Sequence, residues 1–243
     1  MFDPREFAIT KAKPLPLYLM LDTSGSMGGP KIEELNNAVN ELINSLANEE
    51  KSEVEILISI ITFGGSVQLH TPPTPASDIN FEYFSASGVT PMGGALSKAK
   101  KLIEDRGVTP SRAYRPTIIL MSDGLPTDSW EAPLNSFIND GRSQKCDRMA
   151  MSIGGEGEEV LREFIKNTEN DLFNASDAKD IHEFFRYVTM SVTARSKSQN
   201  PNLIPNREEL EQGNVVTLDV DESENANQTD GVSTSGKDNE PMW

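Results

Sequence analysis

The chain has 243 residues and a formal net charge of −16 at pH 7, and this acidity argues against direct binding to a nucleic-acid backbone, which needs a basic face. Its single cysteine, Cys146, excludes a disulfide within the chain, and no apolar run reaches the roughly 18 residues of a membrane-spanning helix. We therefore expect a cytoplasmic protein in a reducing compartment that binds neither nucleic acid nor membrane.

Strand and helix patterns alternate along the chain. Short apolar or β-branched runs are typical of buried strands, and apolar residues at helical spacing indicate helices. In chain order the expected elements are a strand over Leu15–Leu21, a helix over Lys31–Leu46, strands over Val54–Phe63 and Ser66–His70, a helix over Ala95–Arg106, a strand over Thr117–Ser122, a helix over Trp130–Asn139, a strand over Cys146–Ile153, a helix over Glu158–Lys166, a short strand at Leu172–Phe173 and a helix over Ala178–Val192.

This alternation predicts an α/β fold, a doubly wound (Rossmann-like) and mostly parallel sheet with helices on both faces. Gly64 and Gly65 allow a tight turn, so Ser66–His70 is expected to return as one antiparallel edge strand. The proline-rich stretch Thr71–Ser77 is expected to be a loop.

The chain divides into three parts by composition. We expect an N-terminal extension over residues 1–13, one domain over 14–195, and an acidic, largely disordered C-terminal tail over 196–243. The tail holds ten acidic and three basic residues. Val215–Val220 has enough β propensity for an edge strand, so the tail is either a solvated linker or a partner-docking element.

Oxygen-bearing side chains follow the first strand. Asp22, Ser24 and Ser26 come directly after the apolar run that ends at Leu21, on a stretch that contains Gly25. A set of oxygen ligands without thiolate or imidazole suits hard cations such as Mg²⁺, Mn²⁺ or Ca²⁺. Each residue, taken alone, is more simply explained as an ordinary turn or cap residue.

Two later segments can complete such a site. Thr90 precedes the helix that contains Ala95, and Asp123 follows the strand that ends at Ser122. The strands ending at Leu21 and Ser122 should be neighbours. Their carboxyl ends would then meet at the switch point of the sheet, where doubly wound folds bind ligands.

Together these residues resemble the metal-ion-dependent adhesion site of von Willebrand factor A (VWA) domains, whose pattern is Asp-x-Ser-x-Ser, then a distant Thr and a distant Asp. The resemblance covers roughly residues 14–195. It implies that Ser24 and Ser26 bind the metal directly, that Thr90 does so in some states, and that Asp22 and Asp123 act mainly through water. It further implies a non-catalytic module that captures an Asp or Glu carboxylate of a partner protein through the bound Mg²⁺, Mn²⁺ or Ca²⁺.

The short segments TPMGGAL and MSDG look most like those of bacterial cytosolic members, including members associated with tellurite (tellurium) resistance and phage defence. That similarity implies a stress or defence signalling role beside a kinase, phosphatase or ATPase. Met27, Gly28 and Met92 are expected to rim the metal, as is Gly29. Asp128 either caps the helix that follows it, which we prefer, or contributes to the rim.

Two other functions stay open. A metal-dependent hydrolase or phosphatase would also use a cation, but the chain has no GxSxG motif, no Walker motif and no paired Cys and His. We therefore expect no enzyme activity. In the third possibility the domain is a structural subunit of a larger complex, and the metal only stiffens the loops.

Overall fold

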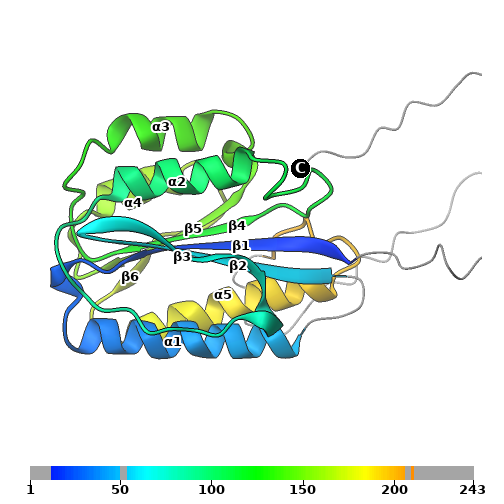
Figure 1. The fold of residues 1–243 in the computed structure, drawn as a ribbon, viewed down its shortest axis with the longest axis horizontal. Helices are drawn as coiled ribbons and strands as arrows, with labels where there is room; N and C mark the ends of the chain where they lie inside the picture. The colour runs from blue at the N-terminus through cyan, green and yellow to red at the C-terminus, as the bar shows by residue number, and fades with distance from the viewer. Residues whose placement is uncertain (1–11, 50–53, 206–208, 211–243) are drawn as a thin grey trace, which may run out of the picture.

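The computed structural model describes residues 12–49, 54–205, 209 and 210. Its centre is a six-stranded sheet with the order β3-β2-β1-β4-β5-β6 (Figure 1). The β2–β3 pair is antiparallel, and the other four strand pairs are parallel. The strands are β1 Lys13–Asp22, β2 Val54–Gly64, β3 Ser66–Pro75, β4 Thr117–Ser122, β5 Asp147–Ile153 and β6 Phe173–Ala175.

Helices cover both faces of the sheet. In Figure 1, α1 and α5 lie below the sheet, and α2, α3 and α4 lie above it. The helices are α1 Pro30–Asn48, α2 Met92–Glu104, α3 Glu131–Asn139, α4 Glu158–Phe164 and α5 Lys179–Lys197. Short 3₁₀ turns occur at Gly25–Met27, Ala76–Asp78 and Ser143–Lys145. The doubly wound α/β fold expected from the sequence is confirmed.

Strand β1 is buried on both sides. Leu17 and Leu19 belong to the core between the sheet and α1 and α5. Tyr18 and Met20 belong to the core between the sheet and α2, α3 and α4. Side chains of a strand alternate between the two faces of a sheet, so a strand covered on both faces must be apolar at almost every position. This is why residues 15–21 form a nearly continuous apolar run.

The switch point lies between β1 and β4. From β1 the chain continues to β2 and β3 on one side of the sheet, and it later returns to β4, β5 and β6 on the other side. β1 and β4 pair in parallel with Leu21 opposite Met121. The residues that follow these two strands therefore begin at the same edge of the sheet.

Several expected boundaries differ in the structure. The stretch Thr71–Ser77 was expected to be a loop, but β3 continues to Pro75 and pairs with β2 through two irregular register shifts. Prolines are tolerated there because β3 is an edge strand, whose outer N–H groups have no ladder partner. α2 begins at Met92, earlier than predicted, and α5 ends at Lys197.

The described structure continues past α5. The buried Arg195 donates a hydrogen bond of 2.8 Å from Nε to the Pro201 carbonyl, and Asn202 accepts one of 2.8 Å from the backbone N–H of Arg115. Residues 198–205 thus return to pack on the domain. The predicted strand over Val215–Val220 and the disorder expected over Ser223–Glu240 lie outside the described residues. Among the helices that are described, none is both long and apolar enough to cross a bilayer.

Candidate metal centre

Asp22 is the last residue of β1, and it is fully buried. Its Oδ1 accepts a hydrogen bond of 2.8 Å from the Ser24 backbone N–H, and its Oδ2 accepts one of 2.5 Å from the Ser122 hydroxyl. Burial raises the pKa of the Asp22 carboxyl above its usual value, hydrogen bonds from Ser122 and Ser24 lower it in part, and the charge of Asp123 raises it. A cation beside Asp22 would favour the charged form.

Ser24, Ser26 and Asp123 form a connected chain of oxygen atoms. Ser24 Oγ lies 3.0 Å from Ser26 Oγ, and the Ser26 hydroxyl donates a hydrogen bond of 2.7 Å to Asp123 Oδ1. Ser24 and Asp123 are buried, while Ser26 is exposed. The structure therefore brings these three residues together at a place that opens to solvent at Ser26.

Thr90 reaches this place on a loop that is held from both sides. On one side, the backbone N–H of Gly25 donates to the carbonyl of Gly88 at 2.9 Å. On the other, the carbonyl of Thr90 accepts from the Thr127 N–H at 2.9 Å, and the Thr127 hydroxyl accepts from the Thr90 N–H at 3.0 Å. The Thr90 side chain is buried. Within the described structure it makes no hydrogen bond to Asp22, Ser24, Ser26 or Asp123.

Gly88 makes this arrangement possible. Its φ is +71°, a left-handed conformation that glycine adopts without strain. A Cβ at this position would lie 2.5 Å from Cα of Gly65, which is closer than two carbon atoms can approach. The loop before Thr90 can therefore pack closely against the turn between β2 and β3 only because position 88 is glycine.

Asp128 caps a helix, but a different one from that predicted. Its Oδ1 and Oδ2 accept hydrogen bonds of 2.9 and 2.8 Å from the N–H groups of Gly93 and Gly94, in the first turn of α2. The helix that follows Asp128 is α3, and no side chain caps its N-terminus at Trp130. Asp128 therefore ties the loop after β4 to the start of α2, next to Thr90.

Two of the expected rim residues are buried instead. Met27 is 0% exposed and packs in the core beneath α1, and Met92 is 0% exposed in the core beneath α2. Both lie in helical turns whose apolar side points into the protein, so neither side chain can touch a partner. Gly28 is exposed, as a rim position requires.

Two residues of the centre were not foreseen. Ser122, the last residue of β4, donates the hydrogen bond to Asp22 described above. The register of β1 and β4 explains this contact, because Leu21 lies opposite Met121 and the next pair along would be Asp22 and Ser122. Lys31, in the first turn of α1, places its Nζ 2.6 Å from Asp123 Oδ2. The sequence predicts where this helix begins, but it does not show that the Lys31 side chain points toward Asp123.

The donor set fits a hard divalent cation. Among the described residues, no cluster of three or more His, Cys, Asp or Glu side chains is placed to hold a metal, so this centre depends on its hydroxyl groups. Two carboxylates and neighbouring hydroxyl oxygens are ligands that Mg²⁺ and Ca²⁺ accept. The ammonium group of Lys31 already rests against Asp123, which shows that the centre attracts positive charge.

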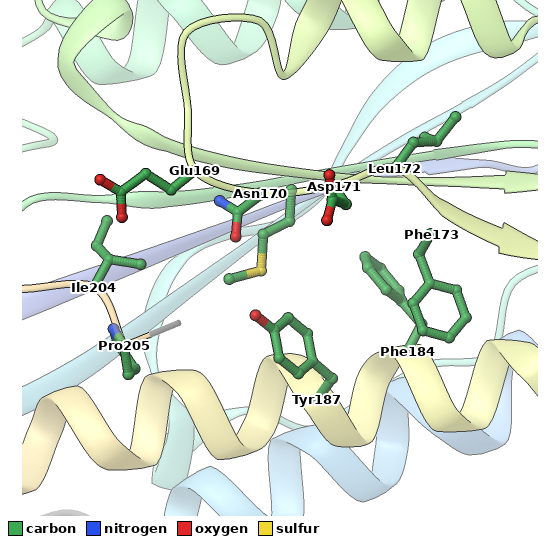
Figure 2. A pocket seen from close by; sticks show the side chains of 10 residues that line it. Glu169, Asn170, Asp171, Leu172, Phe173, Phe184, Tyr187, Ile204 and Pro205 are labelled. Atoms are coloured by element: carbon green, nitrogen blue, oxygen red, sulfur yellow. The ribbon is translucent and has the colours of Figure 1, made fainter. Parts of the chain in front are cut away.

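A pocket elsewhere is a weaker candidate. It lies between α5 and the segment that precedes β6, and Figure 2 shows Phe184 and Tyr187 pointing into it from α5. Its volume is about 80 Å³. Small-molecule sites usually measure roughly 300 Å³ or more, so this pocket holds little beyond a few water molecules.

Comparisons with known proteins point to the same family as the sequence resemblance. The family model of the von Willebrand factor type A domain matches residues 17–125. Inter-alpha-trypsin inhibitor heavy chain H4 of Homo sapiens is 26% identical over 180 residues, which are 70% of this chain and 18% of that protein. The chain thus spans less than a fifth of the length of this relative.

Solved structures share the fold at low identity. A von Willebrand factor type A protein from Catenulispora acidiphila has a TM-score of 0.58 at 17% identity, over 74% of this chain and 42% of that one. Proximal thread matrix protein 1 from the mussel byssus was solved with zinc in its metal-ion-dependent adhesion site (MIDAS) motif. It has a TM-score of 0.56 at 13% identity, over 73% of this chain and 48% of that one. Residues 17–125 are thus similar in sequence to the von Willebrand factor type A domain, and the described structure shares the fold of these solved proteins.

Proposed function

We propose that this chain is a non-catalytic protein-binding module that depends on a divalent cation. Mg²⁺ is the cation we favour, with Mn²⁺ or Ca²⁺ as alternatives, held by Asp22, Ser24, Ser26, Thr90 and Asp123. The observation that carries the proposal is the chain of oxygen atoms from Ser24 through Ser26 to Asp123 at the switch point. The zinc-occupied site of the mussel protein supports the same assignment.

The chemistry of these residues suits capture of an acid. A bound cation supplies an electrophilic centre, and hydroxyl ligands leave most of its charge uncompensated because they are neutral. Asp22 is fixed by Ser122 and by the Ser24 N–H, so it orients the loop without facing solvent. Ser26 is the exposed member of the set, so a partner carboxylate would approach from its side.

The biological setting is a proposal of its own. We infer a cytoplasmic protein whose partner offers an Asp or Glu side chain, and a kinase, phosphatase or ATPase is the partner class that the sequence resemblance suggests. The named relatives give no support to a tellurite-resistance type or to a stress role. Gene neighbourhood would distinguish these settings.

The test is selection of a peptide library on the immobilised protein with Mg²⁺ or with EDTA. We expect enrichment of Asp- or Glu-containing peptides with Mg²⁺ only, and loss of that enrichment in the double variant Ser24→Ala, Ser26→Ala. The exposed pair Ser45→Ala, Ser77→Ala is the matched control and should bind as the unaltered protein does. Enrichment that persists in EDTA would refute metal dependence. Turnover of a generic phosphate ester that requires Mg²⁺ and Asp22 would favour the hydrolase alternative.

A further inference from the structure

Lys31 contacts the candidate metal centre directly. Its Nζ lies 2.6 Å from Oδ2 of Asp123, and the side chains of Lys31 and Asp123 are 34% and 0% exposed. The other carboxylate oxygen of Asp123 accepts the hydrogen bond from Ser26. Both oxygens of Asp123 are therefore engaged, one by a hydroxyl of the candidate site and one by a positive charge.

The position of Lys31 in α1 is unfavourable for a lysine. α1 begins at Pro30, so Lys31 lies in the first turn, where the helix dipole presents roughly half a positive charge. The helix itself gains nothing from a cation there. The stabilising partner is Asp123, which lies 92 residues further along the chain and on a different element.

We propose that Lys31 is a tethered counter-ion that balances Asp123 when no divalent cation is bound, and that it thereby lowers the affinity of the centre for that cation. The inference rests on the proposed metal site. When a divalent cation enters, Lys31 either stays and repels it or leaves and loses its contact with Asp123. Either event opposes cation binding. An interaction that stabilises only the metal-free protein lowers its affinity for the cation by the same factor.

Lys31→Gln tests this directly, because glutamine keeps a polar side chain and removes the charge. Competition with a chelating dye for Mg²⁺, and electron paramagnetic resonance of free Mn²⁺, report cation affinity without any partner. We expect both cations to bind Lys31→Gln about tenfold more tightly, which corresponds to about 1.4 kcal/mol. Lys31→Arg keeps the charge and should bind within about twofold of the unaltered protein.

Two further measurements guard against a folding artefact. In EDTA, Lys31→Gln should melt at a lower temperature than the unaltered protein, because the buried Asp123 loses its cation. Added Mg²⁺ should raise the melting temperature of Lys31→Gln by more than it raises that of the unaltered protein. Lys197→Gln is the matched control, since Lys197 pairs with Glu49 at 2.5 Å near the opposite end of α1, and its cation affinity should not change.

The outcomes separate the two proposals. If the unaltered protein binds Mn²⁺ and Lys31→Gln binds it equally or more weakly, Lys31 does not compete, and the metal-dependent module stands without this inference. If neither protein binds Mg²⁺ or Mn²⁺, the metal site itself is wrong and the inference falls with it.

Discussion

Replacing Ser122 by alanine removes a buried hydrogen bond to Asp22, together with a longer one of 3.3 Å that the Ser122 hydroxyl accepts from the Gly124 N–H. The Ser122 hydroxyl donates a hydrogen bond of 2.5 Å to Asp22, and both residues are 0% exposed. A hydrogen bond to a charged group contributes about 1.5–3 kcal/mol, and Asp22 keeps the bond from the Ser24 N–H. We therefore expect Ser122→Ala to lower the free energy of unfolding by about 2 kcal/mol at neutral pH.

Ser152 provides a matched control one strand away. It lies opposite Ser122 in the β4–β5 register and is also 0% exposed, but its hydroxyl has no hydrogen-bond partner within the described structure. Ser152→Ala removes a buried polar atom that gains nothing from folding. It should therefore leave stability unchanged or raise it by up to about 1 kcal/mol.

Urea unfolding in EDTA measures both variants, and pH adds a second check. The folded-state pKa of Asp22 lies above its ordinary value, so its contribution is favourable at low pH and is lost as pH rises through the folded pKa. Ser122→Ala removes a bond to the charged form and raises that pKa further. Its deficit should therefore be largest at pH values well above both folded-state pKa values, and it should shrink as pH falls through them, since both lie above the ordinary value for Asp. Equal losses for Ser122→Ala and Ser152→Ala would refute the argument.

Three further predictions concern contacts described above or buried groups. Asp128→Ala should lower the free energy of unfolding by about 1–2 kcal/mol in urea, because α2 loses its cap, and an unchanged midpoint would contradict this. Cys146, whose thiol pKa burial raises to about 12, should resist a thiol reagent at pH 8 until urea unfolds the protein; fast labelling of the folded protein would show otherwise. Burial also raises the pKa of Tyr18 to about 12, above its unfolded value of about 10, so its contribution to stability is complete below pH 10 and is lost toward pH 12. Tyr18→Phe should flatten that alkaline loss, and parallel profiles for the two proteins would count against it.

Much of the fold could be predicted because its strands are buried on both faces. A strand such as β1 cannot tolerate polar residues in its middle, so its extent is visible in the sequence. Asp22, Ser24 and Ser26 lie within five residues and could not be far apart. β3 was harder to predict, because an edge strand can contain prolines that a sequence pattern assigns to a loop.

The rest of the centre depends on contacts that spacing does not reveal. The loop that carries Thr90 is positioned by hydrogen bonds from the Gly25 N–H to the Gly88 carbonyl and from the Thr127 N–H to the Thr90 carbonyl, and neither contact follows from sequence spacing. Met27 was expected on the rim, but it lies buried in the 3₁₀ turn at Gly25–Met27. Lys31 was predicted as a helix residue, and its ion pair requires the three-dimensional path of the loop after β4.

The two edges of the sheet restrict how this domain can assemble. Three of the ten residues of β3 are prolines, at positions 72, 73 and 75, which offer no N–H to an added strand. β6 has only three residues, too few to template a stable ladder. Extension of the sheet from one molecule into the next is therefore unfavourable at either end. In the proposed function, recognition falls to the loops that follow β1 and β4, and a bound partner would be released by withdrawing an ion rather than by separating strands.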